Sequence, residues 1–343
     1  MASNLNLPAT MKAIQIQKTG GIDVIELRDV PVPVPKENEV LIKVEYAGIN
    51  YIDTYFRSGL YPVPLPFTLG QEASGRLLSF PSSAAILDSE DYKRRGYALG
   101  DRIAAYSGGS LAEYVAVPWV VTAKLPDAVD SRTAAAVVVG GLTALTAIRE
   151  AYEVKKGDWV LVHAAAGGLG LALCQLASQA GAHVIGTTSS PEKAALAKEN
   201  GAEHVILYTK QNIVDSVLEL TKGEGVHGIF DGVGKDTWED NFKVARRKGT
   251  IVSIGNASGA VPPFAPLKLS PKNLKLVRPN MGNYVTTAQE MDTFAGELFN
   301  LVSRGAFKVK IHGEYEFSAE GVQKAQEDIT GRGTTGKLIV KVA

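Results

Sequence analysis

The first 135 residues alternate hydrophobic and polar positions in short runs that are typical of β-strands. MKAIQIQ (residues 11–17) and EVLIKVEYAGI (residues 39–49) both show a period of two, which puts successive side chains on opposite faces of a strand. Proline and glycine interrupt the pattern repeatedly between residues 31 and 75. We therefore predict a mostly antiparallel β-domain, with the polar stretch 79–98 forming a surface loop.

Beyond residue 135, apolar runs alternate with helical patterns. Strands that alternate with helices form right-handed βαβ units around a parallel sheet, and a glycine-rich turn follows the first of these runs. Six such units predict an α/β fold with a doubly wound, six-stranded parallel sheet of the Rossmann type. The predicted strands are WVLVH (159–163), HVIGT (183–187), HVIL (204–207), VHGIFD (226–231), TIVSIG (250–255) and LKLV (274–277).

The C-terminal part of the chain changes character again. We predict a helix over 286–304, a short strand around Val309, a helix near 318–329, and a last strand in KLIVKV. We expect this tail to fold back onto the N-terminal domain. The predicted domains are therefore 1–135 together with 282–343, and 136–281.

The turn after the first parallel strand carries the strongest chemical signal. A strand leads directly into small residues that open a helix, so the backbone can approach a pyrophosphate and the helix N-terminus can bind it. The turn departs from GxGxxG, because Ala165 stands at the first glycine position. The strand before it and the helix after it favour a dinucleotide site over a merely structural turn. Its residues are Ala166, Gly167, Gly168, Leu169 and Gly170.

The end of the second parallel strand indicates which dinucleotide is bound. NAD sites usually place an acidic residue there to hold the ribose hydroxyls. Here the strand ends in hydroxyl residues up to Ser189 and Ser190, and Lys193 follows, which suits a 2′-phosphate. We interpret Glu192 as a first-turn helix residue that the helix dipole favours. The sequence therefore predicts NADPH.

Composition narrows the class of protein. Lys plus Arg and Asp plus Glu both number 36, so no basic excess indicates nucleic-acid binding. The longest basic cluster, Arg246-Arg247-Lys248, fits the C-terminus of a helix predicted over 237–247. The single cysteine, Cys174, cannot form an internal disulfide or a Cys-rich zinc site. No leader pattern or membrane span is apparent, and we expect a cytoplasmic protein.

Five separate motifs resemble one known family. They resemble the ζ-crystallin-type quinone oxidoreductases of the medium-chain dehydrogenase/reductase superfamily, from about Met11 to the C-terminus. The resemblance implies a GroES-like, β-rich catalytic domain, a Rossmann domain, NADPH and usually a homodimer. The stretch 79–98 departs from the family pattern because it is longer. The motifs are INYIDTYFRSGLYP, HAAAGGLG, VIGTTSSPEKAALAKENGA, FDGVGKDT and SIGNASGAVPPFAPLKL.

The resemblance also bears on metal binding. Zinc-dependent relatives use a Cys, a Gly-His-Glu and a second Cys around the catalytic metal. The corresponding positions here are Asn50, Gly70-Gln71-Glu72 and Ala164 or its neighbours, and Asn and Gln are poor zinc ligands. We therefore predict no metal site. Without a Lewis acid, reduction of a quinone or enone is favoured over alcohol oxidation, because hydrogen bonds alone can assist it.

Where the motifs match, the family's site residues can be assigned to positions of this chain one by one. The resemblance assigns Asn50, Tyr55 and Tyr61 to the nicotinamide and the acceptor, although the tyrosines could instead be packing residues. Arg332 matches an arginine that reaches the phosphates, with a plain surface charge as its alternative. The other implied contacts are Thr143 (nicotinamide ribose), Ser189 and Lys193 (2′-phosphate), Tyr208 (adenosine side), and Gly255 and Asn256 (nicotinamide side).

The function predicted from sequence is NADPH-dependent reduction of a quinone or another conjugated carbonyl acceptor without a metal. The alternative is a 2-alkenal or enone reductase of the same superfamily. Some ζ-crystallin-type proteins also bind AU-rich RNA, and others serve as lens proteins. Zero net charge argues against strong nonspecific RNA binding, and the cofactor signature argues against a purely structural role.

Overall fold

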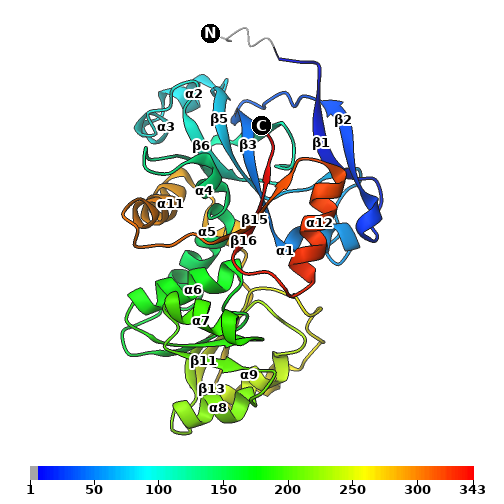
Figure 1. Cartoon of the computed structure of the whole chain (residues 1–343). Coiled ribbons are helices and arrows are strands. Elements are labelled where there is room, and N and C mark those ends of the chain that lie inside the picture. Colours follow the sequence, from blue (N-terminus) through cyan, green and yellow to red (C-terminus); the bar gives the residue numbers. More distant parts are fainter. Residues whose placement is uncertain (1–6) are drawn as a thin grey trace. The chain divides into compact units, whose positions relative to one another are not determined.

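The computed structural model describes residues 7–343, which divide into two compact units (Figure 1). Unit 1 contains the described residues up to Val139 together with Val285–Ala343, and unit 2 is Gly140–Tyr284. The domain limits predicted from sequence, 135/136 and 281/282, lie four and three residues before these boundaries. Within residues 7–343, none of the helices combines the length and apolar character that are needed to span a membrane.

Unit 1 is the β-rich unit that the alternating pattern predicts. A seven-stranded sheet has the order β15-β16-β3-β5-β6-β8, with β7 also paired to β3, and a smaller sheet has the order β2-β1-β4. All the pairs are antiparallel except β15 with β16. The strands are β1 (Thr10–Ile16), β2 (Ile25–Pro31), β3 (Glu39–Ile49), β4 (Phe67–Thr68), β5 (Glu72–Ser79), β6 (Arg102–Tyr106), β7 (Tyr114–Pro118), β8 (Thr122–Lys124), β15 (Ile311–Glu316) and β16 (Lys337–Lys341).

The C-terminal tail returns to unit 1, as predicted. β16 lies antiparallel beside β3, with Leu338 opposite Ile49. The strand expected around Val309 begins at Ile311 instead. Two helices come from this tail and four from the N-terminal part: α1 (Tyr51–Ser58), α2 (Ala84–Asp88), α3 (Glu90–Arg94), α4 (Ser131–Ala135), α11 (Ala288–Ser303) and α12 (Ala319–Thr330), with short 3₁₀ turns at η1 (Ile22–Val24) and η2 (Trp119–Val121).

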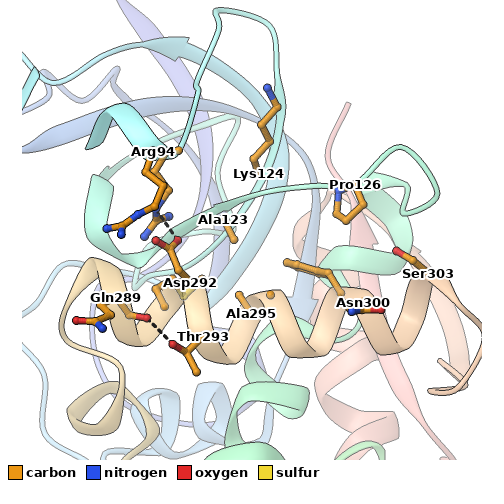
Figure 2. Close-up of a pocket in the computed structure, with 14 residues that line it drawn as sticks. Arg94, Ala123, Lys124, Pro126, Gln289, Asp292, Thr293, Ala295, Asn300 and Ser303 are labelled. Carbon is orange, nitrogen blue, oxygen red and sulfur yellow. Dashed lines mark hydrogen bonds and ion pairs between the residues drawn. The ribbon is translucent and has the colours of Figure 1, made fainter. Parts of the chain in front are cut away.

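The stretch 79–98 is not a surface loop, so that prediction is wrong. It forms α2 and α3, and Tyr92 enters the core of unit 1, where its ring lies 5.2 Å from that of Trp119. Arg95 is also buried and forms a 2.7 Å ion pair with Asp292 of α11. Figure 2 shows Asp292 reaching from α11 toward the end of α3. The polar composition of the stretch concealed these two buried anchors.

Unit 2 contains the predicted doubly wound sheet. Its six strands are all parallel, in the order β11-β10-β9-β12-β13-β14. The direction of winding reverses between β9 and β12, and ligands bind at such a reversal in open α/β sheets. The strands are β9 (Trp159–Val162), β10 (His183–Thr188), β11 (His204–Leu207), β12 (Val226–Asp231), β13 (Ala245–Ser253) and β14 (Lys275–Val277).

The helices of unit 2 follow the predicted βα alternation, with one correction. The helix predicted over 237–247 ends at Val244, and the basic cluster 246–248 lies in β13. Ala245 already pairs with Val226 of β12, and this pairing ends the helix early. The elements are α6 (Gly168–Gln179), α7 (Pro191–Glu199), α8 (Ile213–Leu220), α9 (Trp238–Val244), α10 (Met281–Tyr284), the π-helical η3 (Ala147–Ala151) and the 3₁₀ segment η4 (Pro266–Lys272), while α5 (Val138–Thr146) begins in unit 1 and continues in unit 2.

The contacts of Arg95 predict a large cost for its removal. Besides its ion pair, the guanidinium donates to the carbonyls of Thr122 and Ala288. We expect Arg95→Met to lower the free energy of unfolding by about 2 to 3 kcal/mol, because buried acceptors and Asp292 lose their partner. Arg94→Met is the matched control, since Arg94 is exposed and should change stability by less than about 0.5 kcal/mol. Urea unfolding followed by circular dichroism measures both, and equal effects would contradict the anchoring role.

Candidate active site

Three neighbouring strands of unit 1 bring polar side chains together around Asn50. Asn50 follows β3 directly and precedes the first residue of α1. β16 lies antiparallel on one side of β3 and starts with Lys337. β5 lies on the other side and starts with Glu72. The ends of three strands therefore meet at one point of the sheet.

These three side chains form a closed hydrogen-bonded network. Lys337 Nζ lies 2.5 Å from Glu72 Oε1 and donates to Asn50 Oδ1 at 2.6 Å. Asn50 Nδ2 donates to the same Glu72 Oε1 at 2.8 Å. The second carboxylate oxygen, Glu72 Oε2, accepts the backbone N–H of Val139 at 2.6 Å. Glu72 is fully buried and Lys337 is 8% exposed, so the network is largely screened from water.

Gly48 makes room for this network. A Cβ placed on Gly48 would collide with the Glu72 carboxylate and with the backbone oxygen of Ala135. The missing side chain therefore lets the carboxylate lie against β3. A larger residue at this position would push Glu72 away from Asn50.

Asp53 is a second buried carboxylate beside Asn50. It is fully buried, and it accepts the backbone N–H of Asn50 at 2.8 Å and that of Gly70 at 3.0 Å. Burial raises the pKa of Asp53 to about 6, against the lowering effect of these two hydrogen bonds. Asp53 thus fixes the backbone at the start of α1 and ties it to the turn before β5.

The two predicted tyrosines lie next to each other. The Tyr55 and Tyr61 rings are 5.1 Å apart, edge to face, and Tyr61 N–H donates to the carbonyl of Tyr55 at 3.2 Å. Tyr55 also packs near Tyr51 of the same helix. The packing role considered from sequence is therefore present. A role of their hydroxyl groups toward an acceptor stays a prediction.

In unit 2, the glycine-rich turn joins β9 to α6. Gly167 is the N-cap residue, and no side chain caps the helix start. A Cβ on Gly170 would collide with the Ala164 carbonyl, whereas one on Gly167 would lie 3.4 Å from it. Gly170 is therefore needed for packing the helix against the turn. Gly167 leaves space in front of the first N–H groups of α6, where an anion can bind.

Four other predicted residues follow the C-terminal ends of parallel strands, at the same edge of the sheet. Ser189 follows β10, Tyr208 follows β11, and Gly255 and Asn256 follow β13. Tyr208 is 42% exposed, whereas Asn256 is buried. The glycine at 255 is required because a Cβ would lie 2.6 Å from the carbonyl oxygen of Gly232. The predicted residues of unit 2 thus border one edge, although their contacts with a cofactor stay predictions.

Lys193 lies in the first turn of α7, close to that edge. Its helix starts as predicted: Ser190 caps it by accepting the N–H of Lys193, and Pro191 occupies the first position. Partial burial lowers the pKa of the Lys193 ammonium, and a bound dianion would act in the opposite direction by favouring the charged form. Ser189 and Lys193 therefore stand at the start of the same helix.

The two remaining predicted residues lie elsewhere. Thr143 is in the part of α5 that belongs to unit 2. Arg332 belongs to unit 1, in the turn between α12 and β16, with a left-handed φ of 58°. Its charge opposes the effect of burial on Tyr51, whose phenol pKa is raised. The structure thus groups Arg332 with the Asn50 side of the chain.

Sequence reasoning missed three buried charged residues near these positions: Asp53, Asp231 and Lys337. Asp231 ends β12 and accepts hydrogen bonds from Asn241 Nδ2 at 2.6 Å and from Thr237 Oγ1 at 2.8 Å. Asp231 lies in the motif FDGVGKDT, which was a usable signal. Lys337 had none, because its strand begins 287 residues after Asn50.

The positions that correspond to zinc ligands in metal-dependent relatives are otherwise engaged here. Asn50 is bound by Lys337 and Glu72, and Gln71 Nε2 donates to the carbonyl of Gly70 at 2.7 Å. Ala164 has no side-chain donor atom. Among residues 7–343, no three His, Cys, Asp or Glu side chains are grouped in a way that could hold a metal ion.

Unit 1 also has a cavity of about 760 Å³ between α3, β8 and α11 (Figure 2). It contains none of the predicted site residues. Figure 2 shows Asp292 on the α11 side of this cavity, where it pairs with Arg95. The cavity is the space left between these packed elements, and we do not assign the active site to it.

Comparison with known proteins agrees with the family resemblance seen in the sequence. Residues 36–127 match the alcohol dehydrogenase GroES-like domain, and residues 168–298 match the zinc-binding dehydrogenase family. The quinone oxidoreductase of Pseudomonas aeruginosa is 39% identical over 334 residues, which cover 96% of this chain and 99% of that protein. The chain belongs to the quinone oxidoreductase family. This family is part of the medium-chain dehydrogenase/reductase superfamily, and the predicted fold class is confirmed.

Solved members of the quinone oxidoreductase family have the same fold. The Escherichia coli quinone oxidoreductase, solved with NADPH, is 35% identical with a TM-score of 0.90, covering 96% of this chain and 100% of that one. A mycobacterial protein solved with NADPH is 39% identical with a TM-score of 0.90, covering 97% and 100%. The 2-haloacrylate reductase of a Burkholderia species is 31% identical over 337 residues, which cover 96% of this chain and 98% of that protein.

Asp53 predicts a particular dependence of stability on pH. Its folded-state pKa of about 6 lies above the ordinary 3.8, so between these values the folded protein holds a proton that the unfolded chain has lost. This group therefore lowers the free energy of unfolding by about 2 kcal/mol as the pH rises from 4 to 6.

Asp53→Asn cannot titrate and removes that contribution. Urea unfolding of wild type and Asp53→Asn at several pH values between 4 and 7 tests it. The difference in stability, wild type minus variant, should decrease with rising pH and then level off. Two parallel pH profiles would contradict the raised pKa.

Proposed function

We propose that this chain is an NADPH-dependent reductase of quinones that works without a metal. The observation that carries the proposal is the edge of the unit 2 sheet, where an uncapped, glycine-rich helix start lies together with Ser189 and the cationic Lys193. The family membership of the chain supports the same activity. The solved relatives that contain NADPH support the choice of cofactor.

The residues at this edge fit a dinucleotide phosphate. The first N–H groups of α6, after Gly167, can bind the pyrophosphate, because Gly167 and Gly168 present no side chain there. Ser189 and Lys193 can hold a 2′-phosphate through hydroxyl and ammonium donors. Bound NADPH supplies a hydride, that is, a proton with two electrons. Thr143, Tyr208, Gly255 and Asn256 are proposed as the remaining unit 2 contacts, and Arg332 as a unit 1 contact.

In unit 1, we assign the acceptor to Asn50, Tyr55 and Tyr61. Reduction places negative charge on an oxygen of the acceptor, and amide N–H and phenol O–H groups can donate hydrogen bonds to it. Tyr55 and Tyr61 hold each other in place through their ring contact, which orders the two phenol rings that we assign to the acceptor. No metal is needed for this type of stabilisation.

A conjugated aldehyde or ketone is the second candidate acceptor. The 2-haloacrylate reductase relative favours it, since a haloacrylate also carries a C=C bond conjugated to a carbonyl group. A first assay follows the oxidation of NADPH and NADH by chelator-treated protein with an ortho-quinone, a para-quinone and a 2-alkenal. NADPH-selective turnover that is fastest with a quinone supports the proposal. Faster turnover with the alkenal would favour the second candidate, and NADPH binding without turnover would refute both.

We further propose a homodimer in the cytoplasm. β14 forms an edge of the six-stranded sheet, and an edge strand offers unpaired backbone groups for pairing with a second copy. Light scattering that gives the mass of one chain would contradict the dimer. Binding of AU-rich RNA is retained only as a second activity, which salt-dependent RNA retention and competition by NADPH would support.

Lys193→Glu tests the 2′-phosphate assignment. Replacing the cation with an anion should raise the KM for NADPH by about 10- to 100-fold, because a charge-assisted hydrogen bond is lost and repulsion is gained. The KM for NADH should change much less. Lys198→Glu is the matched control, as an exposed lysine in the last turn of the same helix. Equal losses with both cofactors would contradict the assignment.

A further inference from the structure

The charged neighbours of Asn50 determine which way its carboxamide points. A lysine ammonium can only donate hydrogen bonds, and an ionised carboxylate can only accept them. Lys337 must therefore face Asn50 Oδ1, and Glu72 must face Asn50 Nδ2. The structure has both contacts, at 2.6 Å for Lys337 and 2.8 Å for Glu72. A flipped carboxamide would place its NH₂ group against the ammonium and its oxygen against the carboxylate. Both contacts would then be repulsive.

The network lies at the ends of three neighbouring strands inside the sheet, β16, β3 and β5. Glu72 is fully buried and is further fixed by the N–H of Val139, while Gly48 leaves the space for its carboxylate. Low local polarity strengthens hydrogen bonds among buried groups. A buried ion pair adds little net stability, however, because removing both charges from water is costly. The pair therefore calls for an explanation other than stability.

One carboxamide hydrogen of Asn50 is held only weakly and can turn to a better acceptor. Nδ2 donates one hydrogen to Glu72 at 2.8 Å, and it also donates to the Gly48 carbonyl in a long hydrogen bond of 3.5 Å, a distance at which the interaction is weak. The carbonyl Oδ1, by contrast, is occupied by Lys337. The side chain is thus oriented as a hydrogen-bond donor.

We propose that Lys337 and Glu72 are positioning residues that hold Asn50 as a donor to the acceptor oxygen. This inference rests on the proposed function. Hydride addition to the acceptor moves an electron pair onto its oxygen, which becomes an oxyanion and then takes a proton from water. The locked N–H stabilises that oxyanion. An unlocked carboxamide would present its own oxygen part of the time and repel it.

The informative variant is Glu72→Gln combined with Lys337→Met. It removes both charges of the pair together, so neither partner is left as an unpaired charge, and it keeps the side chains similar in size. The Val139 N–H keeps the oxygen of the introduced glutamine on its side, so the glutamine NH₂ group faces Asn50, and the introduced methionine cannot donate to Oδ1. The Asn50 carboxamide is then no longer held as a donor. We expect kcat to fall by about 10- to 100-fold, in the range seen for a lost oxyanion donor, with the KM for NADPH changed less than about twofold.

Lys341→Met is the matched control, because Lys341 is exposed at the other end of β16. It should leave kcat unchanged. If the double variant folds and also keeps the wild-type kcat, the proposal is wrong.

A comparison in the background of Asn50→Ala separates positioning from other roles. If Lys337 and Glu72 act through Asn50, the charge-removing pair of substitutions should reduce kcat no further once Asn50 is gone. If they act on the substrate themselves, or only support the fold, the separate losses should multiply. Multiplying losses would overturn the proposal.

A measurement that needs no turnover tests the fixed orientation of the Asn50 carboxamide, called the lock below, separately from the proposed activity. Nuclear magnetic resonance can follow exchange of the Asn50 carboxamide protons with water, using Asn50→Ala for assignment. Exchange should be at least about tenfold slower in wild type than in the charge-free variant, because the bonded N–H must break from Glu72 before it exchanges. Equal exchange rates would refute the lock even in an active enzyme. A confirmed lock without reduction of any quinone would refute the activity alone.

Discussion

The pairing of β3 with three other strands is the constraint on which the proposed acceptor site in unit 1 depends. β3 lies antiparallel to β5, β7 and β16, and Asn50 stands where it ends. Hydrogen bonding along the strands fixes their register, and a shift by one residue would turn every side chain to the opposite face. Glu72 and Lys337 therefore reach Asn50 only in this register, and the space at Gly48 is useful only there.

Unit 2 brings its residues together in a different way, because its sheet is parallel. Its parallel strands carry their C-terminal ends to a common edge, so residues as far apart in sequence as Gly167 and Asn256 border the same place. Backbone groups provide most of the chemistry, as helix N–H groups and close approaches at glycine. In the proposed site, specificity is left to a few side chains near the strand ends, among them Lys193 in the first turn of α7.

The parts that could be predicted from sequence are those that local pattern determines. Each parallel strand is an apolar run with a turn after it, and VHGIFD and HVIL match β12 and β11 to the residue. The stretch 79–98 could not be predicted, because the burial of Arg95 depends on the Ala288 carbonyl and the Asp292 carboxylate, which lie nearly 200 residues away. Lys337 is similar: only pairing of the last strand with β3 shows that it is buried.

Unit 1 is split in the sequence, whereas unit 2 is continuous. During synthesis, every strand of the parallel sheet leaves the ribosome before Val285 does, and domains that are complete can fold as units while the chain grows. The antiparallel sheet must wait for β16. Until its first residue arrives, Glu72 has no ammonium partner and Asn50 has no fixed orientation. The proposed nucleotide site of unit 2 can thus be complete in a nascent chain whose proposed acceptor site in unit 1 is still unfinished.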